Sequence, residues 1–276
     1  MEKAASIYEA HHVLNGEHPV EWANVLRGLA TVQDAMGNLE DCADSYTEAL
    51  ELLWGACGKD HLDYGEVSLN LSCIELRLNQ LDDALEACKE AQRVFELIGE
   101  GCEPQLASAL MNTAVVYKKR NKNNRAFSLL VQACEVYKQH TGEDTVEYAL
   151  CTYNLAMVLG SMQRLREAAP LFQRCASIYE RSTPEGRDHP QAKAARHYLS
   201  LCGDVAEAEN DPRHTAEPPP SYSAPPPLSV DDETQVESAA DVTADAAAAA
   251  AVALPVEVPG AAGPPSYEEA SSSPTI

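Results

Sequence analysis

The sequence has few aromatic residues and few basic ones. Aromatic residues make up 6% of the 276 residues, and 20 Lys and Arg stand against 43 Asp and Glu, which gives a formal net charge of -23. Nucleic acid and anionic membrane surfaces repel so acidic a chain. No apolar run approaches the ~18 residues that a membrane-spanning helix requires. We therefore expect neither nucleic-acid binding nor membrane insertion.

Motifs that carry chemistry are also missing. The sequence contains no Gly-rich phosphate loop, no nucleophile elbow and no HExxH pattern. Its nine cysteines include no CxxC pair, and no histidine stands near them at metal-ligand spacing. We expect no enzymatic activity, no catalytic residue, no cofactor and no metal. Reduced cysteines and an N-terminus without an apolar signal segment indicate a cytoplasmic protein.

What the sequence does have is an internal period of 42 residues. Small residues recur at this spacing through four units without a gap, which indicates that helices approach closely there. The clearest series are Ala30, Ser72, Ala114 and Ala156; Cys42, Ala84, Ala126 and Ala168; and Ala49, Ala91, Ala133 and Cys175. We expect the first series, on the first helix of each unit, to face the second series, on the second helix.

Each unit reads as helix, turn and helix, and Gly and Pro separate the units. Residues 4–9 match residues 175–180, so the chain begins within a second helix. The predicted array spans residues 1–203, followed by a tail over 204–276. Its parts are a half-repeat (1–17), repeats at about 18–60, 61–102, 103–143 and 144–188, and a terminal helix (189–203).

This pattern resembles the tetratricopeptide repeat, in the ~42-residue form seen in kinesin light chains. The resemblance rests on the opening His18-Pro-Val-Glu-Trp-Ala23, the triplet Asn154-Leu-Ala156 and the close Gly186-Arg-Asp-His-Pro190. It implies an all-α protein, a right-handed α-solenoid of helix-turn-helix repeats. The first helices of such an array line a concave groove that binds a peptide or protein client.

Two sets of residues are candidates for that groove. The resemblance places the repeated amides of Asn70, Asn112 and Asn154 there, where an amide can donate to and accept from an extended peptide; alternatively, they satisfy the array's own backbone. Arg77, Lys118 and Lys119 form a basic patch that can attract an acidic peptide. The alternative is a solvated turn whose cations complement a helix C-terminus.

The tail has a different composition. Residues 204–276 hold 12 of the 17 prolines and 14 acidic residues, but no Phe, Trp or Lys. Such a segment buries too little apolar surface to offset the entropy of ordering it, so we expect intrinsic disorder. A flexible tail of this length has a reach of about 50 Å, enough to fold back on the groove.

The two tyrosines of the tail share one setting. Each follows Pro-Pro-Ser, in the segments Pro219-Pro220-Ser-Tyr222 and Pro264-Pro265-Ser-Tyr267. This PPxY pattern resembles ligands of WW domains, in which paired prolines pre-form a polyproline II helix and the tyrosine fixes position. Chance would put prolines at both places before a tail tyrosine about one time in forty.

The sequence therefore predicts a scaffold or adaptor. Its groove would hold a client, and its PPxY motifs would recruit WW-domain proteins such as certain ubiquitin ligases. The alternative is a structural subunit of a cytoskeletal, ciliary or kinesin-related assembly in which the tail is a passive linker.

Overall fold

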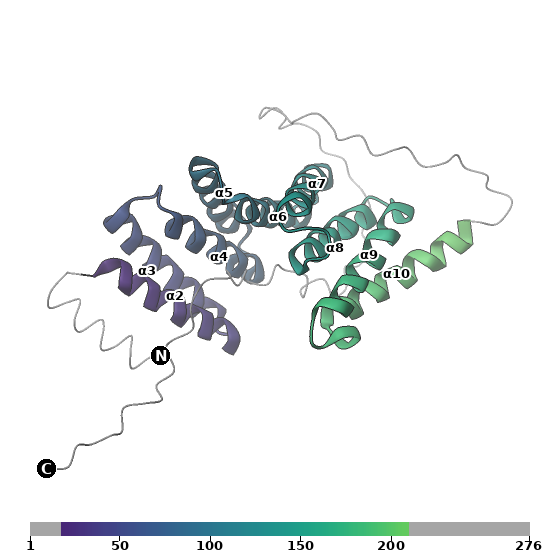
Figure 1. Ribbon diagram of the computed structural model, residues 1–276, viewed down its shortest axis with the longest axis horizontal. Coiled ribbons are helices and arrows are strands. Elements are labelled where there is room, and N and C mark those ends of the chain that lie inside the picture. Colours follow the sequence, from purple (N-terminus) through teal and green to yellow (C-terminus); the bar gives the residue numbers. More distant parts are fainter. Residues whose placement is uncertain (1–17, 210–276) are drawn as a thin grey trace, which may run out of the picture.

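The computed structural model describes residues 18–209, with side chains described through Cys202. This part of the chain is all-α, as the repeat pattern predicts, and it contains no strand. The half-repeat predicted for residues 1–17 and the PPxY motifs lie outside the described residues. The elements, labelled in Figure 1, are α2 (Pro19–Met36), α3 (Leu39–Cys57), α4 (Leu62–Leu78), α5 (Leu81–Ile98), α6 (Glu103–Lys119), α7 (Asn123–His140), α8 (Val146–Ser161), α9 (Leu165–Ser182), η1 (Gly186–Asp188) and α10 (Pro190–Glu209).

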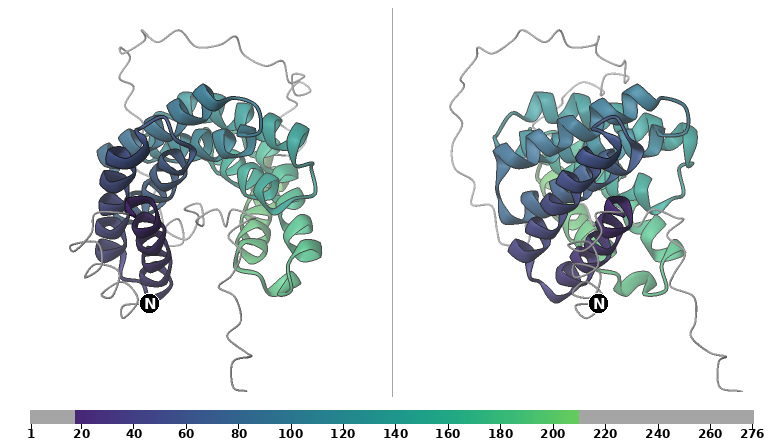
Figure 2. Two further views of the ribbon diagram at one scale, coloured as in Figure 1. Left: turned by 60° about the vertical axis from the view of Figure 1, so that its left-hand side comes forward. Right: turned by 90° about the vertical axis from the view of Figure 1, so that its left-hand side faces the viewer.

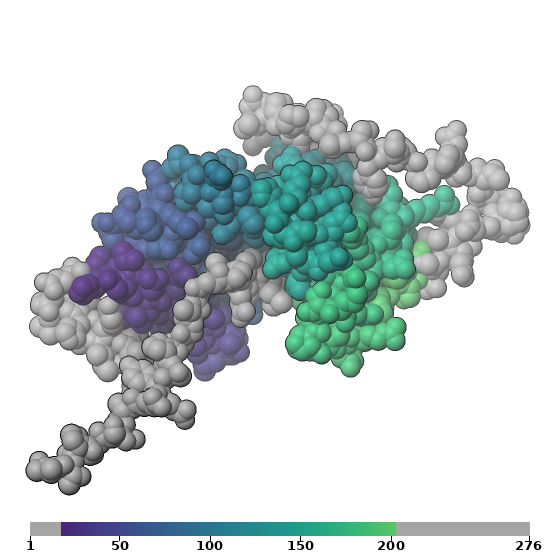
Figure 3. Space-filling view, viewed as in Figure 1, coloured from purple at the N-terminus to yellow at the C-terminus, as the bar shows by residue number. Residues whose placement is uncertain are grey.

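The helices pair, and the pairs stack into an arch. Each second helix packs on the first helix of the next pair, so α3 contacts α4, α5 contacts α6, and α7 contacts α8. First helices of successive pairs also meet, α4 with α6 and α6 with α8. The stack bends around these first helices (Figure 2), while the pairs remain in continuous contact (Figure 3). The described chain is therefore an α-solenoid with α2, α4, α6 and α8 on the inside of the curve.

The turn within each pair has the same geometry in all four repeats. One or two residues after each first helix, a residue adopts a left-handed conformation, and the N–H of the next residue donates to the carbonyl oxygen five residues before it. This is the Schellman arrangement, which ends a helix by satisfying its last carbonyls. The left-handed residues are 42 apart: Gly37 (φ 79°), Asn79 (φ 61°), Asn121 (φ 58°) and Gln163 (φ 62°). The sequence period is thus a backbone period as well.

Gln163 is the least suited of these four residues to its conformation. Glycine adopts positive φ freely and asparagine tolerates it, whereas a longer side chain costs about 1–2 kcal/mol there. We expect Gln163→Gly to raise the free energy of unfolding by about 0.5–1 kcal/mol, because the flexibility of glycine in the unfolded chain cancels part of the gain. Thermal denaturation measures this, with Gln163→Ala as the control that keeps a Cβ. Equal stability of the two variants would contradict the inference that the left-handed conformation at Gln163 destabilises the protein.

The small residues of the 42-residue series lie where two helices touch. All eight members of the two facing series are fully buried. In the first pair the Cys42 thiol donates to the Ala30 carbonyl oxygen at 3.1 Å, so side chain and backbone are in direct contact. The expectation that these positions let the helices of a pair approach closely is confirmed. Between them, larger side chains such as Tyr46, Leu130 and Phe172 fill the core.

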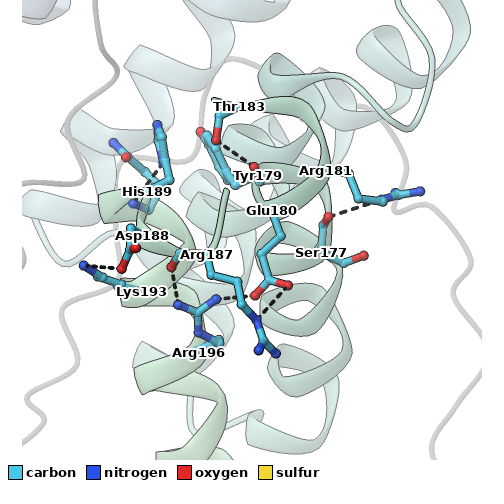
Figure 4. Close-up of polar contacts among 11 residues, drawn as sticks. Ser177, Tyr179, Glu180, Arg181, Thr183, Arg187, Asp188, His189, Lys193 and Arg196 are labelled. Carbon is cyan, nitrogen blue, oxygen red and sulfur yellow. Dashed lines mark hydrogen bonds and ion pairs between the residues drawn. The ribbon is translucent and has the colours of Figure 1, made fainter. Parts of the chain in front are cut away.

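Stacked rings and ion pairs join α10, the last helix, and the segment before it to α9 (Figure 4). The His189 ring stacks on Tyr179, with ring centroids 4.6 Å apart. Glu180, on α9, pairs with Arg196 of α10 and lies 3.6 Å from Arg187 in the connecting segment. α10 continues through Glu209, beyond the boundary predicted at residue 203. The sequence after that boundary, Val205-Ala-Glu-Ala-Glu209, consists largely of good helix formers.

Candidate functional site

The inner surface of the arch is formed by the helices that carry the predicted binding residues. Asn70 lies on α4, Asn112 on α6 and Asn154 on α8, each at the same place in the 42-residue register. The basic residues lie in the last turns of these helices, Arg77 on α4 and the neighbouring pair Lys118 and Lys119 on α6. The fold thus brings both predicted sets onto three adjacent helices.

Asn112 is engaged between two first helices. It is 1% exposed, and its Nδ2 donates to Ser72 Oγ at 3.0 Å and to Cys73 Sγ at 3.1 Å, both on α4. Its Oδ1 is buried without a hydrogen-bond partner among the described residues. One half of this amide therefore joins α6 to α4, and the other half is an unused acceptor. Leaving such a group unpaired costs about 1–3 kcal/mol.

The other two amides differ from Asn112 in exposure or pairing. Asn154 is 5% exposed, and its buried Nδ2 has no partner among the described residues, so it leaves a donor unused where Asn112 leaves an acceptor. Asn70 is partly exposed. Of the three amides, Asn70 is thus the one that the structure presents to a ligand without any rearrangement.

Two of the predicted cations reach back into the preceding repeat. Arg77 pairs with Asp34 on α2. Lys119, 42 residues after Arg77, donates from Nζ to the Leu76 carbonyl oxygen at 3.2 Å and to Asn79 Oδ1 at 3.1 Å. Lys119 thereby satisfies a carbonyl in the last turn of α4, where a cation also complements the helix dipole. Both side chains therefore take part in contacts between repeats.

Lys118 differs from these two cations. It is half-buried, and its side chain makes no hydrogen bond or ion pair to any described residue. Burial, together with the neighbouring charge of Lys119, lowers the pKa of the Lys118 ammonium. An incompletely hydrated cation without a counter-ion attracts a carboxylate more strongly than a fully exposed one does. Lys118 is therefore the predicted cation best suited to bind an anionic group.

A cluster of ion pairs between α2 and α4 was not predicted. Arg27 Nη1 lies 3.5 Å from Glu66 Oε2 and 3.7 Å from Asp63 Oδ1. Burial raises the pKa of the Glu66 carboxyl, and the charge of Arg27 opposes that shift. Asp63 and Glu66 follow Arg27 by 36 and 39 residues. These spacings differ from the 42-residue period, so the repeat pattern does not predict the ion pairs. They give the N-terminal part of the inner surface a mixed charge.

Two features that residues 18–209 lack bear on the kind of site. Within residues 18–209 no helix is both long enough and apolar enough to cross a membrane. In the same part of the chain, no three His, Cys, Asp or Glu side chains come together in an arrangement that could hold a metal ion. The inner surface carries amides, cations and carboxylates along the curve of the arch.

Comparison with known proteins agrees with the repeat assignment. The tetratricopeptide repeat model matches residues 106–147 and 149–191, which hold the third and fourth helix pairs. A clustered mitochondria protein homolog from Candida albicans is 25% identical over 187 residues, 68% of this chain and 14% of that protein. KINESIN LIGHT CHAIN-RELATED 3 from Arabidopsis thaliana is 24% identical over 110 residues, 40% of this chain and 17% of that protein. The chain thus matches less than a fifth of the length of either relative.

Solved structures show the same fold. The crystal structure of BtubC (BKLC) from P. vanneervenii aligns with a TM-score of 0.57 at 18% identity, covering 83% of this chain and 95% of that one. A putative kinesin light chain from Podospora anserina aligns with a TM-score of 0.56 at 15% identity, covering 71% of this chain and 92% of that one. At these identities the likeness concerns the fold alone. Residues 106–147 and 149–191 therefore match tetratricopeptide repeats, and the described chain folds as an α-solenoid similar to those of these solved structures.

Proposed function

We propose that this protein is a cytoplasmic adaptor whose inner surface binds a client peptide and whose two PPxY motifs recruit WW-domain proteins. The observation that carries the first half is the inner surface itself, where Asn70 is accessible and Lys118 lacks a counter-ion among the described residues. An extended peptide would hydrogen-bond to the Asn70 amide through its backbone. A Glu or Asp of that peptide would pair with Lys118. The client is therefore a segment with at least one acidic residue.

The groove half of the proposal predicts a loss of client binding when these two side chains are shortened. A hydrogen bond to a charged group contributes about 1.5–3 kcal/mol, so we expect Asn70→Ala/Lys118→Ala to weaken client binding by about tenfold or more. Affinity capture from a lysate by the full-length chain, with quantitative mass spectrometry, measures this loss. The matched control is Lys122→Ala/Asn124→Ala, which removes the same residue types from exposed positions at the start of α7.

If the Asn70/Lys118 variant and the Lys122/Asn124 control capture clients equally, the clients bind away from Asn70 and Lys118. If the Asn70/Lys118 variant loses its clients while its unfolding temperature stays unchanged, the loss comes from the contact and not from the fold. Either result leaves the second half of the proposal untouched, since the variants do not alter the PPxY motifs.

The tail half predicts a separate loss. In a WW ligand the tyrosine and the paired prolines fill the aromatic-lined groove, whereas the residue between them faces away. We expect Tyr222→Ala/Tyr267→Ala to abolish capture of WW-domain proteins and Ser221→Ala/Ser266→Ala to preserve it. Two motifs on one chain raise the effective concentration of each, so either tyrosine variant alone should reduce capture only in part. If the wild type and all variants capture the same proteins, the tail acts as a linker.

A structural role in a kinesin-related, cytoskeletal or ciliary assembly is the second candidate. It is favoured by the kinesin light chain names among the similar proteins. This role predicts that the captured proteins co-purify as one stoichiometric complex and that replacing both tail tyrosines changes nothing. The tyrosine experiment therefore separates the two functions directly.

A further inference from the structure

Two thiols on neighbouring repeats lie in direct contact. Cys134, on α7, and Cys151, on α8, have their Sγ atoms 2.7 Å apart. Both are unbonded thiols, and both are buried, Cys134 at 8% exposure and Cys151 at 0%. A disulfide bond is about 2.05 Å long, so the two sulfur atoms are within a small movement of bonding distance. No other two cysteines in the described part of the chain have their sulfur atoms hydrogen-bonded to each other.

The fold does not require sulfur at these two positions. In the 42-residue register, the same places are held by Leu50 and Val67 at the first interface between repeats and by Gln92 and Ala109 at the second. Val67 and Ala109 are fully buried there, as Cys151 is at the third interface. An apolar side chain is thus sufficient for packing. Of the interfaces between repeats within residues 18–209, only the third has a thiol on each side.

We infer that Cys134 and Cys151 are a site of reversible oxidation, at which a low-molecular-weight disulfide converts the two thiols to a disulfide that joins the third repeat to the fourth. The Cys134 thiol loses its proton and attacks one sulfur of glutathione disulfide, giving a mixed disulfide and one reduced glutathione. Cys151 then loses its proton and attacks the Cys134 sulfur, which releases the second glutathione. Two protein thiols become one disulfide, and one glutathione disulfide becomes two thiols.

The environment of the pair sets the order and the speed of these steps. Burial raises the pKa of the Cys151 thiol well above its usual value, and the contact with Cys134 adds to that shift. The thiolate is the reacting species, so Cys151 reacts slowly with a reagent from solution. Cys134 is the more exposed of the two and therefore reacts first with glutathione disulfide. Exchange should therefore be slow at neutral pH and become faster as pH rises.

The disulfide would restrain the angle between the third and fourth repeats. It joins a second helix to the next first helix across a loop of 17 residues, from Cys134 to Cys151. Crosslinks of that length raise the unfolding temperature of a domain of this size by several degrees. If the inner surface binds clients as proposed above, the restraint also fixes the curvature between α6 and α8. The chemistry of the thiol pair stands independently of that proposal.

The test uses the native full-length chain in glutathione redox buffers at pH 7 and pH 8.5, followed by acid quenching, alkylation and trypsin digestion. The expected product is peptide 126–138 linked to peptide 139–164, with two hydrogen atoms fewer than the separate peptides and with reversal by excess reduced glutathione. The exposed Cys57 provides an internal control, since it should yield only a mixed disulfide with glutathione.

Three variants make the test decisive. Cys134→Ser should abolish the linked peptide and the increase in unfolding temperature, whereas Cys57→Ser should preserve both. Cys134→Leu/Cys151→Val, which copies the first interface, should fold normally and show no redox dependence. If Cys57 is glutathionylated at pH 8.5 while peptides 126–138 and 139–164 remain unlinked at equilibrium, the inference is overturned. Linkage of Cys134 to other cysteines in place of Cys151 would overturn it as well.

Discussion

Replacing Gly65 by alanine is expected to destabilise the protein, although alanine is the better helix former. Gly65 lies on α4 in the series of small residues that includes Ala23, Ala107 and Ala149. A Cβ at Gly65 would lie 2.8 Å from Val94 Cγ1, closer than side-chain contacts allow, and 3.1 Å from a ring carbon of Phe95, which is tighter than most such contacts. Overpacking of a well-filled core costs about 1–3 kcal/mol, and more where the neighbours cannot move.

Val94 and Phe95 have little freedom to make room. They are 0% and 1% exposed, so any shift of Val94 is passed to the rest of the core around α5. Alanine recovers about 1 kcal/mol through its helix propensity. We therefore expect Gly65→Ala to lower the free energy of unfolding by about 1–2 kcal/mol net. Gly65→Val should have a larger effect.

Denaturant unfolding measures the effect, and the chain offers a matched control. Gly55 lies in α3, and a Cβ added there meets no atom within 4 Å. Gly55→Ala should therefore gain stability from propensity alone, by about 0.5–1 kcal/mol. The two alanine substitutions are thus expected to change stability in opposite directions. A gain at Gly65 similar to the gain at Gly55 would show that α4 and α5 are less closely packed than the structure indicates.

The 42-residue period was sufficient to predict the fold because it records a repeated local geometry. Ala30 and Cys42 come into contact as the small-residue series requires. Gly37 and Asn79 mark turns whose left-handed geometry few other residues tolerate. These features depend on residues close in sequence, and each is repeated four times. A single sequence is enough to detect them.

The candidate site was harder to predict because the period gives a residue's position on its helix but not its neighbours in the folded array. Asn112 occupies the same register position as Asn70, yet it is buried because α4 supplies Ser72 and Cys73 as partners. Arg77 and Lys119 satisfy groups of the preceding repeat, which no residue pattern within one repeat specifies. Contacts of this kind depend on the identity of side chains about 40 residues away, and these vary between repeats.

Glu75 should limit the stability of the array at neutral and alkaline pH. It lies on α4 with 9% exposure, and its Oε2 is buried without a partner among the described residues. Burial raises the pKa of the Glu75 carboxyl to about 8, and the nearby carboxylates of Asp83 and Glu86 add to the shift. In the other repeats the same position is held by Gln33, Tyr117 and Leu159, none of which is charged.

The sign of the pH dependence follows from this raised pKa. Below pH ~4.5 the carboxyl is neutral in both the folded and the unfolded chain, so it carries no ionisation penalty. Between pH ~4.5 and ~8 it ionises in the unfolded chain but stays protonated in the folded one, and stability falls as pH rises. Above pH ~8 both states are ionised, and the penalty is constant. The contribution of Glu75 is therefore least favourable in alkaline solution.

We expect Glu75→Leu to raise the free energy of unfolding at pH 8 by about 2 kcal/mol or more, because it removes a buried, unpaired carboxyl from a position that accepts leucine in the fourth repeat. Glu75→Gln should gain less, since its amide also requires partners. The gain of either variant should shrink toward pH 4.5, where the wild-type carboxyl is neutral. Urea unfolding at pH 4.5, 6 and 8 measures this, with Glu96→Gln, an exposed position on α5, as the control. A gain that stays constant over this pH range would show that Glu75 is ionised in the folded protein, and a loss at pH 8 would show that its carboxylate has a stabilising partner.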